Sequence, residues 1–366
     1  MRTALFLFIC FFLSCTNILF NQINRSEDHE LALKEAIEKV PPEQRSAMEW
    51  LISHMPESDL QNLSSEYLSD NSKYAFKAKK NFSWAKNVPD EIFLNYVLPY
   101  ASLNERRDGW RKDFFYKFSP LVKDASSAYE AAVILNNNIF EMVGVIYSTD
   151  RPKADQSPYE SIEVGLASCT GLSFLLIDAC RSVGIPARFV GTPMWHNDSG
   201  NHSWVEIWDG EWHFTGAAEP VENQLNQVWF ADLASKAKTG DMKYGIFAAT
   251  WNKTELYFPM DWLPGIKKYN ALDVTDRYTN QAKIDSGLVA ISIRALNDLG
   301  ERESVNVIIT GENNYFFEGQ SKNETYDMND HLTVFLPKGK AFTIKTRNDS
   351  QIIEIENECV ISLSVK

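Results

Sequence analysis

The chain has 366 residues, of which 44% are apolar and 13% aromatic, and its formal net charge is −13 at pH 7. This length and apolar content suffice for two or three domains, each with its own core. The acidic balance argues against nucleic acid as a partner, because phosphate backbones are bound by basic surfaces. The five cysteines fit neither a disulfide framework nor a zinc motif, so no metal or other cofactor is expected.

The N-terminal residues have the features of a bacterial export signal. Arg2 precedes the apolar run Ala4–Leu13, which is short for a membrane-spanning helix. Leu13-Ser14-Cys15 resembles a lipobox, which implies cleavage after residue 14 and lipid attachment at Cys15. We therefore predict a signal peptide over residues 1–14 and a lipid-anchored protein of the bacterial cell envelope, on the outer membrane or facing the periplasm. A secreted protein and an uncleaved anchor are the alternatives.

Residues 15–125 are predicted to form the lipidated N-terminus, a polar tether and a helical cap. Apolar residues recur at helical spacing within Glu30–Val40 and Arg45–His54, and Pro41-Pro42 ends the first of these helices. Further helices are predicted within Leu60–Phe76 and Asn104–Lys117. We expect the cap to pack on the domain that follows it.

Residues 126–270 are predicted to form the domain that carries the chemistry. A helix over 126–146 and a polar loop lead to a second helix that begins after Ser168. Ser168 can cap this helix, which places Cys169 in the first turn, where unpaired N–H groups and the helix dipole favour a thiolate. Gly184 lies where a helix end favours a left-handed residue. The apolar positions of this helix are Leu172, Leu175, Leu176, Ala179 and Val183.

A strand and a hairpin follow this helix. We predict strands over Ala187–Gly191, His202–Trp208 and Glu211–Phe214, with a two-residue turn at Asp209-Gly210. A thiol at a helix start and an imidazole on a later strand can meet in space. A cysteine nucleophile needs such a base within hydrogen-bond reach.

The motifs of this segment, in order, are Cys169, Gly184-Ile185-Pro186-Ala187-Arg188, His202 with Trp204-Val205-Glu206, and Trp212. Over roughly residues 126–220 the segment resembles the transglutaminase-like (papain-like cysteine) superfamily. The resemblance implies a papain-type core with Cys169 as nucleophile and His202 as base. It also implies that the substrate is an amide bond of a peptide or protein.

One position departs from the superfamily pattern. The superfamily usually places an Asp four residues after the strand Trp to orient the imidazole, whereas this chain has Gly216 there. The predicted tight turn pairs His202 with Ala217, and a bulge would pair it with Gly216 instead. Neither side chain can hold an imidazole N–H, and Glu219, Thr215 or Glu206 could take this role instead. The sequence does not decide among the three, and Glu219 is the candidate that we name as the third catalytic residue.

Aromatic and histidine residues crowd the same region. Trp195 and Trp204 are predicted to contact substrate, with packing in the core as the alternative. His196 and His213 also lie nearby in the sequence, but the short regular spacing of zinc-ligand pairs is missing.

Residues 271–366 are predicted to form a small antiparallel β-sandwich of roughly immunoglobulin-like type. The fold class is therefore α+β, with an N-terminal helical region, a papain-type core and a C-terminal β-sandwich. No residue pattern in the C-terminal module predicts catalysis. Its expected strands are Leu288–Ile293, Ser304–Ile309, Asn314–Glu318, His331–Phe335, Phe342–Lys345, Ile352–Ile355 and Val360–Val365.

Two classes of function fit the sequence. The first is a surface-anchored cysteine enzyme that cleaves or transfers at amide bonds through an acyl-thioester on Cys169. The second is a non-catalytic lipoprotein that keeps the fold for binding or scaffolding, and Gly216 is the residue that favours it. A short distance between the Cys169 sulfur and a His202 nitrogen, beside an open cleft, would favour the enzyme.

Overall fold

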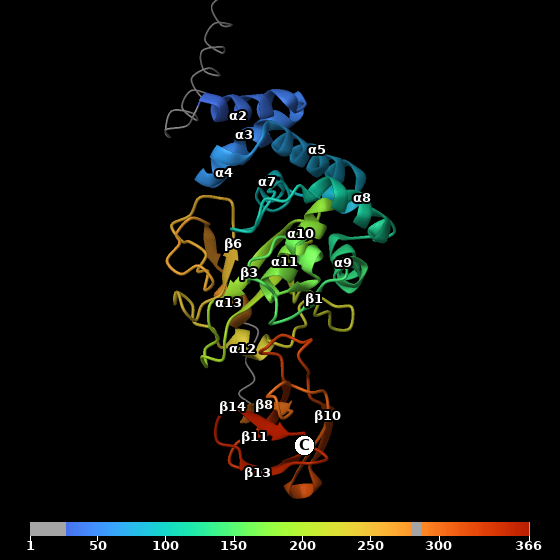
Figure 1. The fold of residues 1–366 in the computed structure, drawn as a ribbon, viewed down its shortest axis with the longest axis vertical. Coiled ribbons are helices and arrows are strands. Elements are labelled where there is room, and N and C mark those ends of the chain that lie inside the picture. Colours follow the sequence, from blue (N-terminus) through green and yellow to red (C-terminus); the bar gives the residue numbers. More distant parts are fainter. Residues whose placement is uncertain (1–26, 280–286, 366) are drawn as a thin grey trace, which may run out of the picture.

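The computed structural model describes residues 27–279 and 287–365, and Figure 1 shows three layers stacked along the long axis. Helices form one end, a mixed helix and sheet core lies in the middle, and a β module forms the other end (Figure 1). This arrangement confirms the predicted α+β class. The predicted signal peptide and Cys15 lie outside the described residues. Within the described ranges, no helix has the length and apolar character needed to cross a membrane.

The helical end contains several short amphipathic helices. Helices α2 and α3 confirm the two helices predicted on either side of Pro41-Pro42. The side chains of Tyr74 and Phe114 lie in the same hydrophobic cluster as Leu175 of the core, so cap and core share buried surface. The helices are α2 (Glu27–Lys39), α3 (Arg45–His54), α4 (Glu57–Asn62), α5 (Ser65–Asn81), α6 (Ser83–Lys86), α7 (Asp90–Tyr96) and α8 (Trp110–Val122).

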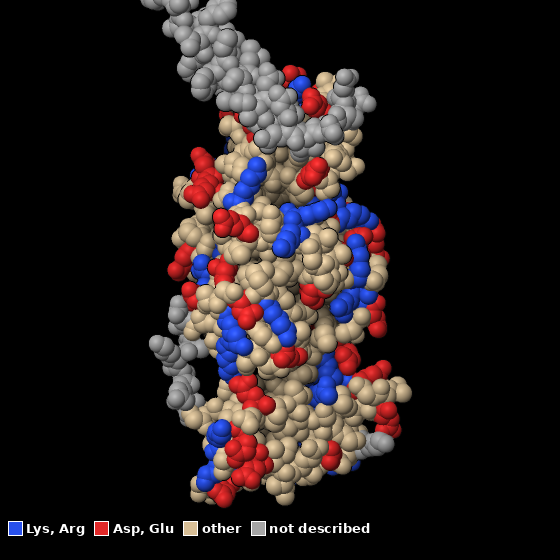
Figure 2. All heavy atoms as spheres, turned by 90° about the vertical axis from the view of Figure 1, so that its left-hand side faces the viewer, with Lys and Arg blue, Asp and Glu red and all other residues tan. Residues whose placement is uncertain are grey.

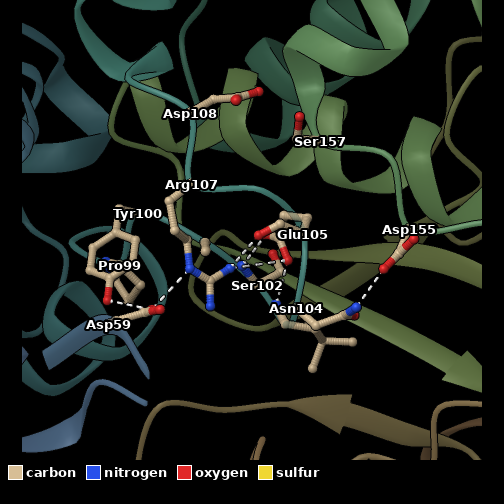
Figure 3. A network of polar contacts seen from close by, with 12 residues as sticks. Asp59, Pro99, Tyr100, Ser102, Asn104, Glu105, Arg107, Asp108, Asp155 and Ser157 are labelled. Atoms are coloured by element: carbon tan, nitrogen blue, oxygen red, sulfur yellow. Dashed lines mark hydrogen bonds and ion pairs between the residues drawn. The ribbon is translucent and has the colours of Figure 1, made fainter. Parts of the chain in front are cut away.

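A polar network joins the helical end to the loop of residues 148–157 (Figure 3). Arg107 Nε donates to Asp59 of α4 at 2.9 Å, and the Tyr100 hydroxyl donates to the same carboxylate at 2.8 Å. Asn104 Nδ2 donates to Asp155 at 2.5 Å. The segment around residues 100–107 is therefore held between α4 on one side and the 148–157 loop on the other.

The core packs helices against a five-stranded sheet with the strand order β5-β4-β3-β6-β7, in which every pair is antiparallel. Its helices beside the sheet are the long α9 (Ala128–Val143) and α11 (Cys169–Ser182) and the short α10 (Pro158–Val164). The strands are β3 (Ala187–Thr192), β4 (His202–Trp208), β5 (Trp212–Thr215), β6 (Phe247–Ala249) and β7 (Ala271–Asp273). Two short strands, β1 (Ile146–Tyr147) and β2 (Leu166–Ala167), form a separate parallel pair, and α12 (Ala231–Ser235) and α13 (Thr275–Thr279) complete the core.

Helix α11 is the central element of the core. All residues from Thr170 to Ser182 are buried, which explains why its sequence is apolar on more than one face. Gly184 follows the helix with a φ of +79°, as predicted from its position. A Cβ at Gly184 would lie 2.7 Å from the Cβ of Ala85 in α6, so the glycine also allows the cap to approach closely.

The β4–β5 hairpin has a different register from the one predicted. Trp208 pairs with Trp212 and Val205 with Thr215, which leaves a three-residue loop instead of a two-residue turn. Continued to its end, this register would place His202 opposite Ala218, so both predicted pairings are wrong. Because β5 ends at Thr215, the chain turns away before it reaches His202.

The C-terminal module confirms the seven predicted strands. They form two sheets, β10-β9-β12-β13 and β11-β8-β14, which enclose one hydrophobic cluster. The β8–β14 pair is parallel, so the prediction of a wholly antiparallel sandwich is wrong at that edge. The strands are β8 (Leu288–Leu296), β9 (Asn306–Gly311), β10 (Phe316–Gln320), β11 (Leu332–Pro337), β12 (Ala341–Lys345), β13 (Ser350–Glu354) and β14 (Cys359–Ser364).

Charged side chains are spread over the molecular surface. On the face seen in Figure 2, lysine and arginine side chains lie beside aspartate and glutamate side chains in all three layers. The formal charge of −13 is therefore not concentrated on this face.

Candidate active site

Cys169 is the first residue of α11 and is partly exposed. The helix start is fixed by Ser168, whose Oγ accepts from Gly171 N at 3.0 Å and donates to Ala154 O at 2.5 Å. Ser168 is therefore the cap that the sequence predicts. The capped helix start places Cys169 at the positive end of the helix dipole, as the sequence predicts.

His202 is the first residue of β4 and is only 1% exposed. Aromatic rings surround its imidazole, and the centroids of Phe230 and Trp229 lie 4.8 and 4.9 Å from the ring centroid. Trp204 and Trp195 follow at 6.0 and 6.2 Å. These rings restrict the orientation of the imidazole by packing.

Trp195 and Trp204 are the two residues predicted to contact substrate. Both indoles are buried, at 1% and 0% exposure, and the Trp204 Nε1–H donates to the Tyr278 hydroxyl at 2.8 Å. They pack in the cluster behind the imidazole, as the packing alternative describes. Trp229, which the sequence analysis does not single out, lines the cavity beside the site.

Three reactive groups converge where α11, β4 and the β module meet. Cys169 Sγ, a ring nitrogen of His202 and a carboxylate oxygen of Asp327 lie within 4.8 Å of one another. Asp327 Oδ2 lies 3.5 Å from His202 Nδ1, and Glu219 Oε2 lies 3.5 Å from His202 Nε2. These are ion-pair distances, and neither ring nitrogen has a hydrogen-bond partner among the residues that the structure describes. The imidazole thus lies between two carboxylates and next to the thiol.

The two carboxylates determine the charge state of the imidazole. Burial alone would lower the pKa of His202, but the negative charges of Asp327 and Glu219 outweigh it and raise this pKa well above 6.5. Burial alone would likewise raise the pKa of Asp327, but the adjacent imidazolium lowers it below its ordinary value. The site therefore favours an imidazolium paired with a carboxylate at neutral pH.

The position of Glu219 accounts for the glycine at residue 216. A Cβ built at Gly216 would lie 2.1 Å from Glu219 Oε2, so the Glu219 carboxylate fills the space that a side chain at 216 would need. Trp229 Nε1 donates to this carboxylate at 2.9 Å and holds it beside the imidazole. The Glu219 carboxylate thus lies 3.5 Å from His202 Nε2, and its role as third catalytic group stays a prediction.

The two other possible partners of the imidazole are engaged elsewhere. Thr215 Oγ1 accepts from Asn136 Nδ2 at 3.0 Å. Glu206 is fully buried and accepts from Arg188 Nε at 2.6 Å and from the Tyr278 hydroxyl at 2.8 Å. Both interactions stabilise the core around the sheet.

Asp327 is the residue that sequence reasoning misses. It lies in the loop between β10 and β11, so the β module contributes a residue to the candidate site although no residue pattern in that module predicts catalysis. The loop contacts the core at two further points: Met328 N donates to the Tyr147 hydroxyl at 3.0 Å, and Asn329 Nδ2 donates to Asn201 O at 2.9 Å. The sequence of this loop has no motif or periodicity that would predict its position. Its contacts are with core residues more than 100 positions away in the sequence.

A cavity of about 780 Å³ lies beside the site, between the core and the β module. Glu219 and Asp327 form part of its wall, whereas Cys169 and His202 do not line it. The cavity is large enough for several residues of an extended peptide. Its aromatic side chains are Phe140, Tyr147, Trp229 and Tyr326.

Cys169, His202 and Asp327 also lie close enough together to act as ligands of a single metal ion. The two other histidines considered in the sequence are not part of this group. His196 Nε2 lies 3.2 Å from Glu358, and His213 Nδ1 hydrogen-bonds to Asn226 Nδ2 at 3.0 Å.

Residues 118–216 match the transglutaminase-like superfamily. No curated protein matches the chain. Among solved structures, the chain is similar to a candidate cysteine protease from Cytophaga hutchinsonii, with 19% identity and a TM-score of 0.30 over 40% of this chain and 48% of that one. It is also similar to a candidate protease from Parabacteroides distasonis, with 9% identity and a TM-score of 0.27 over 65% of this chain and 36% of that one. The chain thus spans about half or less of the length of these two proteins.

Proposed function

We propose that this protein, whose residues 118–216 form a transglutaminase-like core, is a cysteine enzyme that cleaves or transfers at amide bonds of a peptide or protein substrate. The observation that carries the proposal is the convergence of Cys169, His202 and Asp327 within 4.8 Å, with Glu219 on the other side of the imidazole. The adjoining cavity gives an extended chain a place to bind.

In this mechanism the proton of the Cys169 thiol already resides on His202 before attack, and the sulfur attacks the carbonyl carbon of the amide as the thiolate. The C–N bond then breaks as the imidazolium gives its proton to the leaving amine, which leaves an acyl-thioester on Cys169. Water attacks the thioester in hydrolysis and an amine attacks it in transfer, and either step restores the thiol. The carboxylates of Asp327 and Glu219 stabilise the imidazolium, and the Cys169 N–H at the helix start is the candidate oxyanion donor.

The non-catalytic alternative depends on the loss of an orienting carboxylate at residue 216. Glu219 brings a carboxylate into that space and to 3.5 Å from His202 Nε2. The site also adjoins an open cavity. These features favour the enzyme over a binding module that keeps only the fold.

Thiol alkylation tests the proposal without a known substrate. We expect iodoacetamide at pH 7 to label Cys169 at least about tenfold faster than the exposed Cys359. His202→Asn should bring Cys169 to the rate of an ordinary thiol. Rates are measured by mass spectrometry of the peptides, and the buried Cys180 serves as an unreactive internal control, because burial raises its pKa. Equal rates for Cys169 and Cys359 in the unaltered protein would refute the proposal.

We further propose that the protein is anchored at the bacterial cell envelope by a lipid on Cys15. Support comes from the apolar run and the Leu13-Ser14-Cys15 pattern that follows it. Metabolic labelling with an alkyne-bearing fatty acid in a bacterial host is expected to label the protein, whereas Cys15→Ala should remain unlabelled and unprocessed. A labelled Cys15→Ala variant would contradict lipid attachment at this residue.

A further inference from the structure

The loop that carries Asp327 is held in shape by one arginine of the β module. Arg302 is 7% exposed, and its guanidinium donates to backbone carbonyls of the loop and, at 3.3 Å, to the Glu324 carboxylate. Nη2 donates to Tyr326 O at 2.8 Å, and Nη1 donates to Asp327 O at 3.0 Å and to Asp330 O at 3.2 Å. One side chain thus holds three backbone carbonyls of the loop, those of Tyr326, Asp327 and Asp330.

The other contacts of the loop fix its place against the core. Asn329 donates to Asn201 O, and a Cβ at Gly200 would lie 2.7 Å from Asn329 Oδ1, so the loop fits closely against the residues that precede β4. Met328 N donates to Tyr147 beside the cavity. Within the loop, Asn329 N donates to Asp327 Oδ1 at 2.9 Å, which leaves Oδ2 directed at His202 Nδ1.

We propose that Arg302 is a positioning residue, which acts through Asp327 on the imidazole of His202 and makes the β module an integral part of the active site. This inference rests on the proposed function. A carboxylate 3.5 Å from the ring loses much of its effect when it moves by an ångström or more, because its interaction falls with distance and water then enters. Arg302 contacts three carbonyls of this loop at once, so we expect the precise place of Asp327 to depend on it, in addition to the loop's contacts with Asn201 and Tyr147.

Lysine cannot replace Arg302 in this role. The planar guanidinium presents several N–H groups in a fixed fork, whereas an ammonium is one compact centre that cannot reach all three carbonyls. Arg302→Lys keeps the positive charge and most of the volume, so it separates the geometry of the contacts from their charge. The matched control is Arg294→Lys in the same module, where Arg294 Nε donates to the Ser362 hydroxyl of β14 at 2.8 Å and, among the residues that the structure describes, to no carbonyl of the loop.

The test measures the pH dependence of Cys169 alkylation in the full chain. Loss of Asp327 from its place removes a negative charge that raises the pKa of His202, so the imidazolium persists over a narrower pH range and stabilises the thiolate less. We expect Arg302→Lys to slow the alkylation of Cys169 at pH 7 by about tenfold. Above about pH 9.5, where any thiol ionises, Cys169 of the variant and of the unaltered protein should react at the same rate. NMR titration of the His202 imidazole should show a lower pKa in Arg302→Lys and no change in Arg294→Lys.

A double variant decides whether Arg302 acts through Asp327. Asp327→Asn should reproduce the effect of Arg302→Lys, and the combination of both should be no slower than Asp327→Asn alone. An additive loss in the double variant, or an unchanged pH profile in Arg302→Lys while Cys169 of the unaltered protein is activated, would overturn this inference and leave the proposed function standing. An unaltered protein whose Cys169 reacts like Cys359 would overturn both.

Discussion

Replacing Cys169 with serine is expected to lower amide cleavage or transfer by at least about a thousandfold, because a serine hydroxyl is a far weaker nucleophile in a site arranged for a thiolate. His202→Asn should lower turnover by about the same factor. Turnover by the double variant Cys169→Ser with His202→Asn should be no slower than by either single variant, since the two groups act as a unit. Turnover is measured on a peptide library, with the unaltered protein used first to identify a cleaved or modified sequence.

Cys359→Ser is the matched control for this experiment. Cys359 is the first residue of β14, is exposed and lies outside the candidate site, so its loss should leave turnover unchanged. Thermal unfolding of each variant confirms that the fold is intact. Turnover by Cys169→Ser at the rate of the unaltered protein would mean that the chemistry lies elsewhere in the molecule.

The second large effect concerns stability. Replacing Glu206 with leucine is expected to destabilise the core by about 3–5 kcal/mol, because it leaves the Arg188 guanidinium buried without its partner. Glu206 is fully buried, and its carboxylate lies 2.5 Å from Arg188 Nη2 and accepts from the Tyr278 hydroxyl at 2.8 Å. The free energy of unfolding is measured by urea denaturation, followed by tryptophan fluorescence.

A second substitution separates the ion pair from general packing. Arg188→Met combined with Glu206→Leu removes both charges, so the double variant should be more stable than Glu206→Leu alone. If Glu206→Leu instead left the stability unchanged and reduced only Cys169 alkylation, Glu206 would belong to the catalytic site after all.

Local patterns in the sequence determine much of the fold. The Ser168 cap, Gly184 and the apolar spacing of α11 follow from helix chemistry that acts over a few residues, and they appear where the sequence predicts them. The same holds for the seven strands of the β module, whose alternating patterns lie between turn residues. The hairpin register differs because three residues, and not two, connect Trp208 to Trp212.

In the candidate site, too, the residues that could be predicted are those near one another in the sequence. Cys169 and His202 belong to recognisable motifs, Glu219 follows them in the same domain, and the structure brings the three residues together. Asp327 could not be predicted, since its approach to His202 depends on how two domains dock and on a loop conformation set by Arg302. No periodic pattern in the sequence predicts how two domains dock.

The parallel pairing of β8 with β14 has a consequence for biosynthesis. A nascent chain that has left the ribosome as far as β11 already contains the thiol, the imidazole and both carboxylates. At that stage β8 still lacks a neighbour along one edge, because residues 359–364 supply it. The sheet that β8 shares with β11 is therefore completed only when the last strand of the module has been made.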